Sequence, residues 1–234
     1  MSAALLRINA LNAWYGESHV LHGVDVEVNE GEVVTLLGRN GAGRTTTLRS
    51  VLGLVGRRTG AVMINGRDAI GLSPHKIARL GVGYCPEERG IYSSLSTEEN
   101  LLLPPLLGAH GMPLDEIYAM FPNLEKRRAS RGTHLSGGEQ QMLALARILR
   151  TGARLLLLDE ISEGLAPVIV QALARTITAL KEKGYTIVMV EQNFRFAAPL
   201  ADRFYIMERG RIVEGFAASE LQGRMSMLHE FLGV

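Results

Sequence analysis

The chain has 234 residues, of which 47% are hydrophobic and 21% are charged, and its formal net charge is +1. This is the composition of a globular protein with one large or two small domains. A near-neutral balance gives no support to nucleic-acid binding, which usually leaves a basic footprint, so no nucleic-acid partner is expected.

The single cysteine and the amino-terminal segment indicate a cytoplasmic protein. Cys85 cannot form an internal disulfide, which favours a reducing compartment. Residues 1–7 lack the basic region and long apolar run of a signal peptide. No uncharged apolar stretch reaches the ~18 residues of a membrane span, so any role at a membrane requires docking onto a separate membrane partner.

The first part of the chain is predicted to form strands and one helix. Residues 5–8 are apolar-rich, and alternation over 24–28 predicts a strand with one wet face, typical of antiparallel pairing. Residues 33–37 are apolar except for Thr35, as in a strand covered on both faces. A glycine-rich loop and a helix over 45–54 follow, which gives the order strand, loop, helix.

The rest of the chain alternates between predicted strands and helices, which indicates an α/β fold with a mainly parallel sheet and an antiparallel N-terminal β subdomain. The helical pattern over 98–131 is interrupted by prolines and predicts an inserted helical subdomain. We expect one domain, with residues 1–86 and 150–234 as the core and about 87–149 as the helical subdomain. The remaining predicted strands are 61–64, 155–158, 186–190 and a hairpin over 203–213, and the remaining helices are 137–150 and 167–183.

The glycine-rich loop fits the phosphate-binding pattern G-x-x-x-x-G-K-[ST] with one substitution. Gly38, Gly43 and Thr45 match, but Arg44 stands where lysine belongs. Glycines let backbone N–H groups converge on an anion, and the next helix adds its positive end. Arginine keeps the charge but is a planar fork rather than a compact ammonium, so nucleotide binding is expected with altered hydrolysis. Taken alone, the loop could also be a glycine-rich turn with no ligand.

Two further segments carry possible chemistry. Asp159 and Glu160 close an apolar strand, where ligands bind in open α/β sheets, although such a pair could also be a solvated strand end. Leu135–Gln141 reads L-S-G-G-E-Q-Q, in which Ser136 is a good N-cap for a helix whose N-terminus can bind phosphate. The alternative interpretation of that segment is a simple N-cap turn that binds no ligand.

The three segments in this order resemble the ATP-binding cassette of ABC transporters over nearly the whole chain. The resemblance implies that ATP and Mg²⁺ are bound, with Glu160 as the general base. Asp159 and Thr45 would serve the metal together with Glu87, and Gln192 and Arg44 would take part in catalysis. The nucleotide-binding residues would be Tyr15, which stacks on adenine, the loop residues Gly38, Arg39, Asn40, Gly41, Ala42, Gly43, Arg44, Thr45 and Thr46, and the segment Ser136, Gly137, Gly138 and Glu139. That last segment works in trans, so a pair of cassettes is implied.

Several positions depart from the general pattern of the family. Glu87 and Gln192 stand where most cassettes have glutamine and histidine, and Ile161 replaces the usual proline. Pro-Glu-x-Arg, Ser-Glu-Gly-Leu-Ala-Pro over 162–167 and Val-Glu-Gln-Asn over 190–193 resemble the second ATPase of branched-chain amino-acid importers. The ATPase of urea importers is similar in much of this. Gln192 can hydrogen-bond a phosphate oxygen but cannot carry a proton.

The expected function is therefore the ATP-hydrolysing subunit of an importer for branched-chain amino acids or related small solutes, at the cytoplasmic face of the inner membrane. The resemblance implies as partners a second ATPase subunit or a second copy, two membrane permeases and a periplasmic solute-binding protein. Alternatives are a urea or amide importer ATPase and a cassette that binds ATP without hydrolysing it. A cassette of translation or DNA repair, or a small-molecule kinase, explains the sequence less well.

Overall fold

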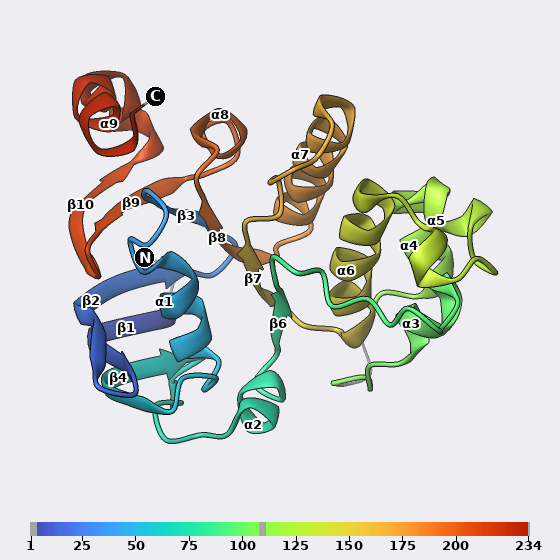
Figure 1. Cartoon of the computed structure of the whole chain (residues 1–234), viewed down its shortest axis with the longest axis horizontal. Helices are drawn as coiled ribbons and strands as arrows, with labels where there is room; N and C mark the ends of the chain where they lie inside the picture. Colours follow the sequence, from blue (N-terminus) through green and yellow to red (C-terminus); the bar gives the residue numbers. More distant parts are fainter. Residues whose placement is uncertain (1–3, 108–110, 234) are drawn as a thin grey trace.

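The computed structural model describes residues 4–107 and 111–233 and contains two β-sheets with helices packed around them (Figure 1). The first sheet has the strand order β2-β1-β4-β5, and all its pairings are antiparallel. Its strands are β1 (Ala4–Tyr15), β2 (Ser18–Asn29), β4 (Arg57–Ile64) and β5 (Arg67–Asp68). The predicted antiparallel N-terminal β subdomain is confirmed.

The predicted first strand was too short, because its periodicity is broken in the middle. Strand β1 continues from Ala4 to Tyr15, and its pairing register with β2 shifts between Ile8 and Leu11. Ala10 adopts a left-handed φ of 45° at that point. Such a bulge interrupts the alternation of apolar and polar residues on which a strand prediction depends.

The second sheet has the strand order β10-β9-β3-β8-β7-β6. Every neighbouring pair is parallel except the terminal hairpin of β9 and β10. The carboxyl ends of the parallel strands therefore meet at one edge, where open α/β sheets bind ligands. The strands are β3 (Val33–Leu37), β6 (Val82–Cys85), β7 (Leu155–Asp159), β8 (Thr186–Glu191), β9 (Arg203–Glu208) and β10 (Arg211–Ala217).

The central strands are buried on both faces, as their continuous apolar runs predict. In β7, Leu156 and Leu158 face a core shared with α6 (Gly137–Thr151) and α7 (Pro167–Glu182), whereas Leu155 and Leu157 face a core shared with α1 (Arg44–Val51) and the N-terminal sheet. Successive side chains of a strand point to opposite faces, so a strand covered on both sides has no polar alternation. Helix α1 is held between the two sheets by Leu48 and other apolar residues.

The helices follow the predicted order, with shorter pieces in the middle of the chain. The predicted helix over 45–54 ends at Val51, because Gly53 adopts a left-handed φ of 75°. The helices are α1 (Arg44–Val51), α2 (Pro74–Ala78), α3 (Thr97–Leu102), α4 (Leu114–Met120), α5 (Pro122–Lys126), α6 (Gly137–Thr151), α7 (Pro167–Glu182), α8 (Phe194–Ala197) and α9 (Met225–Leu232). Helices α3 to α6 gather on the side of the molecule away from the N-terminal sheet (Figure 1).

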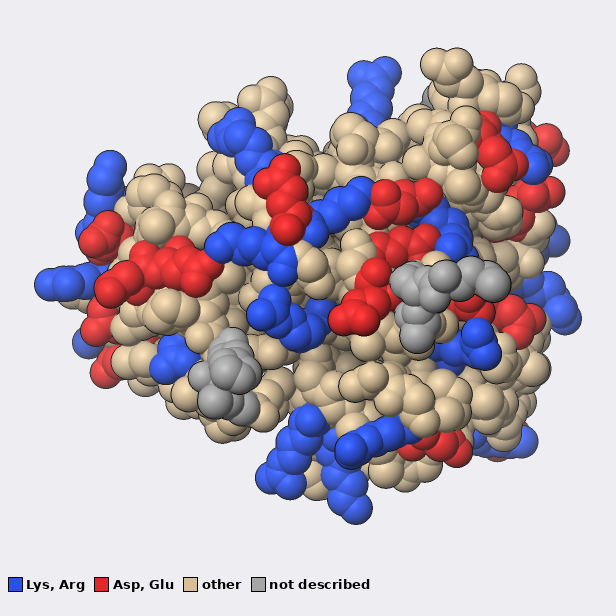
Figure 2. Space-filling model, turned by 180° about the vertical axis from the view of Figure 1, so that it is seen from behind, with Lys and Arg blue, Asp and Glu red and all other residues tan. Residues whose placement is uncertain are grey.

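The surface carries both charge signs. On the face shown in Figure 2, acidic and basic side chains lie interspersed across the middle of the molecule. Within residues 4–107 and 111–233, no helix is both long and apolar enough to cross a membrane. Residues 1–3, which belong to the segment considered for a signal peptide, lie outside the described residues.

Candidate nucleotide-binding site

The glycine-rich loop lies between the end of β3 and the start of α1. Gly43 caps α1 with φ of 107°, and a Cβ built there would come within 2.9 Å of the Leu21 side chain. A Cβ on Gly38 would lie 2.5 Å from the carbonyl oxygen of Met207. Both positions therefore require glycine, for a left-handed conformation and for close packing respectively. The result is a helix N-terminus without a side-chain cap, whose free N–H groups can bind phosphate oxygens.

The side chain of Arg44 turns inward from this loop and is only 4% exposed. Its Nη2 donates to Oε1 of Glu160 over 2.6 Å and to Oδ1 of Asn40 over 3.3 Å. The Nη1 atom of the same guanidinium is buried and has no hydrogen-bond partner in the described part of the chain. A buried unpartnered donor is costly, and an anionic oxygen brought into the loop would satisfy it.

Asp159 lies at the end of β7, and β8 separates β7 from β3, the strand that precedes the loop. The Asp159 carboxylate accepts hydrogen bonds from two hydroxyl groups. Thr45 Oγ1 donates to Oδ1 over 2.8 Å, and the phenol of Tyr84 donates to Oδ2 over 2.8 Å. Burial raises the pKa of Asp159, and the two hydroxyl donors oppose that rise. Threonine and aspartate oxygens are hard ligands of the kind that Mg²⁺ prefers. The predicted metal residues Thr45 and Asp159 are therefore in direct contact.

Glu160 occupies a left-handed turn immediately after the strand, with φ of 47°. Its backbone N–H donates to the carbonyl of Val190 on β8 over 2.9 Å. Burial raises the pKa of its carboxyl to about 7, with help from the nearby Glu163 and against the effect of Arg44. A partly buried carboxylate next to a phosphate loop can accept a proton from a water molecule. A left-handed φ is uncommon for glutamate, and such strain is often found at functional sites.

A cavity of about 330 Å³ connects these groups. Several predicted site residues line it together, namely Asn40, Gly41, Ala42, Gly43, Arg44, Thr45, Thr46, Glu87 and Glu160. Val20 of β2 and Glu163 line it as well, and neither was predicted from the sequence. Arg39 is directed elsewhere, because its Nη2 donates to the backbone carbonyl of Glu230 in α9 over 3.3 Å.

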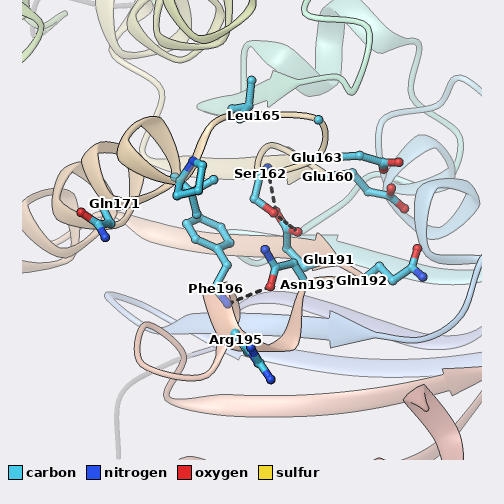
Figure 3. A pocket seen from close by; sticks show the side chains of 13 residues that line it. Glu160, Ser162, Glu163, Leu165, Gln171, Glu191, Gln192, Asn193, Arg195 and Phe196 are labelled. Carbon is cyan, nitrogen blue, oxygen red and sulfur yellow. Dashed lines mark hydrogen bonds between the residues drawn. The ribbon is translucent and has the colours of Figure 1, made fainter. Parts of the chain in front are cut away.

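A second cavity, of about 870 Å³, also has Glu160 in its lining (Figure 3). Its lining includes Glu163, Gln192 and Asn193. Glu160, Glu163 and Gln192 all line this cavity, so the fold brings the predicted site residue Gln192 to the same cavity as the carboxylates. Gln192 follows β8 directly and is exposed.

The segment Ser136–Glu139 begins helix α6 away from both cavities. Ser136 and Glu139 form a capping box, in which the Ser136 hydroxyl accepts from the Glu139 N–H and the Glu139 carboxylate accepts from the Ser136 N–H. The predicted N-cap at Ser136 is therefore confirmed. The guanidinium of Arg89 lies against Gly137, 3.1 Å from where a Cβ would stand. The fold of a single chain therefore does not bring this predicted nucleotide-binding segment to the cavity at the loop.

Tyr15 lies at the end of β1, where its side chain is 45% exposed. An exposed aromatic side chain is free to stack on a planar ligand.

The structure also shows residues that support the site and that the sequence analysis did not identify, because nothing in their local sequence pattern marks them. Tyr84 holds Asp159, and Arg147 of α6 donates to the carbonyls of Arg89 and Gly90, which fixes the loop that carries Glu87.

The glycine-rich loop between strand and helix, with an aspartate and a glutamate at the end of a nearby parallel strand, defines a P-loop nucleotide-binding protein. Residues 21–163 match the family model of ABC transporters. A solved "ATP binding subunit of ABC transporter" has 30% identity and a TM-score of 0.79, with 95% of this chain and 94% of that chain covered. A nucleotide-free ATP-binding cassette has a TM-score of 0.82 at 22% identity and covers 96% of each chain, which supports the fold.

Two curated relatives match almost the full length. The high-affinity branched-chain amino acid transport ATP-binding protein BraG of Pseudomonas aeruginosa is 38% identical over 232 residues, covering 98% of this chain and all of the relative. The lipopolysaccharide export system ATP-binding protein LptB of Escherichia coli K12 is 33% identical over 237 residues, covering 99% and 98%. The chain belongs to the ABC transporter family. It is an ATPase of that family and the ATP-binding subunit of a transporter.

Replacing Arg44 with lysine is expected to raise ATP turnover about threefold to tenfold, equivalent to about 1 kcal/mol on the barrier. The guanidinium of Arg44 is hydrogen-bonded to the Glu160 carboxylate, which is the expected base. The compact ammonium of a lysine would bind the phosphates instead and leave that carboxylate free. Steady-state turnover of Arg44→Lys and wild type tests this. Arg39→Lys, in the same loop but directed to α9, is the matched control and should change turnover less. Unchanged or slower hydrolysis in Arg44→Lys would contradict the prediction.

Proposed function

We propose that this chain is the ATP-hydrolysing subunit of an importer for branched-chain amino acids or related small solutes. The observation that carries the proposal is the match with BraG over nearly both whole chains. The segments 162–167 and 190–193, which resemble this branch of the family, add to it. Relatives in lipopolysaccharide export are also similar, so the direction of transport needs a direct test.

Phosphate binding is proposed at the loop between β3 and α1. The free N–H groups at the start of α1 and the buried, unpartnered Nη1 of Arg44 suit a phosphate chain. Tyr15 would stack on the adenine. Thr45, Asp159 and Glu87 would hold Mg²⁺, which supplies charge neutralisation for the phosphates when bound, and the pairing of Thr45 with Asp159 supports the first two assignments. Glu87 borders the same cavity and would act there as an outer ligand.

Hydrolysis requires a water oxygen to bond to the γ-phosphorus while the bond from that phosphorus to the β,γ-bridging oxygen breaks, so that ADP leaves and a base takes a proton from the water. Glu160 would be that base, because it lies beside the loop and its pKa is raised to about 7. Arg44 would leave Glu160 for the phosphate when ATP binds, which frees the carboxylate. Gln192 would donate a hydrogen bond to a γ-phosphate oxygen from the neighbouring cavity.

The segment Ser136–Glu139 would act on the ATP of a second cassette. It begins a helix whose N-terminus is capped by its own side chains and lies outside the cavities of its own chain. A helix N-terminus presented to a partner is suited to a phosphate. A second ATPase subunit or a second copy would complete each site, and residues 87–149 would pass closure on to two membrane permeases.

The complete importer would include a periplasmic solute-binding protein, and this chain would lie at the cytoplasmic face of the inner membrane.

The proposed function is tested by isolating the transporter through a tag on this chain, reconstituting it in vesicles and measuring ATP-driven movement of labelled leucine. Uptake of leucine supports the proposal. Uptake of urea in place of leucine would assign the related importer class, and ATP-driven lipid extraction without solute uptake would refute an importer.

A further inference from the structure

The buried carboxylate of Glu191 lies outside the roles assigned so far. It is the last residue of β8, is 1% exposed, and directly precedes Gln192. Its Oε2 accepts a hydrogen bond from Ser162 Oγ over 2.8 Å, and its Oε1 accepts one from the Ser162 N–H over 3.2 Å. Figure 3 shows Ser162 and Glu191 pointing toward one another at the wall of the larger cavity. Both carboxylate oxygens of Glu191 therefore accept hydrogen bonds from the same residue, Ser162.

This contact joins the two sequence segments that distinguish this chain from most of its family. Ser162 belongs to the segment 162–167 after Glu160, and Glu191 belongs to the segment 190–193. The two residues are 29 positions apart in the sequence. Because the segments meet through a hydrogen-bonded pair, the movement of one is restrained by the other.

The geometry gives this contact a function beyond packing. Glu160, two residues before Ser162, is in the left-handed conformation, and its backbone N–H donates to the carbonyl of Val190 on β8. Burying a carboxylate in a strand core is unfavourable compared with an apolar side chain unless it is well hydrogen-bonded. An apolar residue at 191 would pack in the sheet, but it would leave the turn after Glu160 without this attachment.

We propose that Glu191 is a positioning residue for ATP hydrolysis, which acts through Ser162 to hold the turn that carries Glu160 and, through the chain, to place Gln192. The inference rests on the role proposed above for Glu160. Positioning of this kind matters because small displacements of a catalytic group lower the rate strongly while leaving ligand binding intact.

The electrostatic surroundings fit a carboxylate held by hydrogen bonds alone. Burial raises the pKa of Glu191 to about 7, while the two Ser162 donors and the more distant Arg44 lower it and Glu163 raises it further. Within residues 4–107 and 111–233, no ion pair includes Glu191. Arg44 is instead paired with Glu160, and Ser162 is the residue that donates both hydrogen bonds to the Glu191 carboxylate.

The test compares Ser162→Ala with Thr186→Ala in the isolated transporter, with turnover and ATP affinity measured separately. Thr186 is on the same strand as Glu191 but at its other end, where its hydroxyl accepts from the Gly31 N–H over 2.8 Å. Each substitution therefore removes one buried hydroxyl group, from Thr186 within β8 or from Ser162 beside it. Ser162→Ala is expected to lower kcat about tenfold with ATP affinity within about twofold, whereas Thr186→Ala should leave kcat unchanged.

Glu191→Gln provides a rescue variant, because its amide oxygen can accept from the Ser162 N–H and its amide nitrogen can donate to Ser162 Oγ. Its kcat is expected to stay within about threefold of wild type, above that of Ser162→Ala. Equal kcat values in Ser162→Ala and Thr186→Ala would overturn the inference, as would a parallel loss of ATP affinity. Glu160→Gln distinguishes failure of the proposed role of Glu160 from failure of the proposed role of Glu191. If Glu160→Gln hydrolyses ATP like wild type, the role of Glu160 as base is wrong. If Glu160→Gln is inactive while Ser162→Ala has normal turnover, only the positioning role of Glu191 is wrong.

Discussion

Replacing Glu160 with glutamine is expected to lower ATP turnover at least about 100-fold while ATP binding persists. The amide keeps the size of the side chain and a hydrogen-bonding oxygen, but it cannot take a proton from water. Binding should persist because neither the contact of Thr45 with Asp159 nor the backbone N–H groups at the start of α1 involve the Glu160 side chain. Loss of the charge also turns the ion pair with Arg44 into a weaker neutral hydrogen bond, which makes that guanidinium easier to release to phosphate.

Single-turnover hydrolysis and equilibrium binding of ATP, measured on the same protein, separate these effects. Glu163→Gln is the matched control, because Glu163 borders both cavities but is exposed and forms no hydrogen bond or ion pair with Arg44 in the described structure. Its turnover should fall by less than about tenfold. If the two variants lose turnover equally, Glu160 has no special role as a base.

The sequence predicts those parts of the fold in which one residue pattern has one physical explanation. The apolar runs that become β3, β7 and β8 have both faces covered, and the structure confirms them within one or two residues. The helix after Ser136 is confirmed because the serine and Glu139 cap it locally. The phosphate loop is equally local, since glycine conformation and the following helix define it.

Contacts between distant segments could not be predicted in this way. Tyr84 and Asp159 are 75 positions apart, and Arg44 and Glu160 are 116 apart. The sequence shows that arginine replaces lysine in the loop, but its pairing with Glu160 depends on how the strands are ordered in the sheet. The contact of Glu191 with Ser162 is hidden for the same reason, because a glutamate that ends a strand is usually solvated.

Glu191→Gln is expected to be more stable than wild type at pH 8 by up to about 3 kcal/mol, with the difference falling to about 1 kcal/mol at pH 5 and vanishing below about pH 4. Burial raises the pKa of Glu191 in the folded protein to about 7, above the ordinary value of 4.5 that applies in the unfolded chain. The folded state therefore binds the proton more tightly. Its favourable contribution is fully present below pH 4.5 and is lost as the pH rises through about 7. Glutamine stays neutral and does not lose it.

Urea unfolding of both proteins at several pH values between 5 and 8 measures this difference, because other titrating groups are common to both and cancel. Glu182→Gln, an exposed glutamate at the end of α7, controls for the change in net charge. A difference that does not grow with pH would mean that Glu191 is charged at little cost in the folded protein. The hydrogen bonds from Ser162 would then outweigh burial, and the carboxylate would hold the turn after Glu160 as an anion throughout the physiological range.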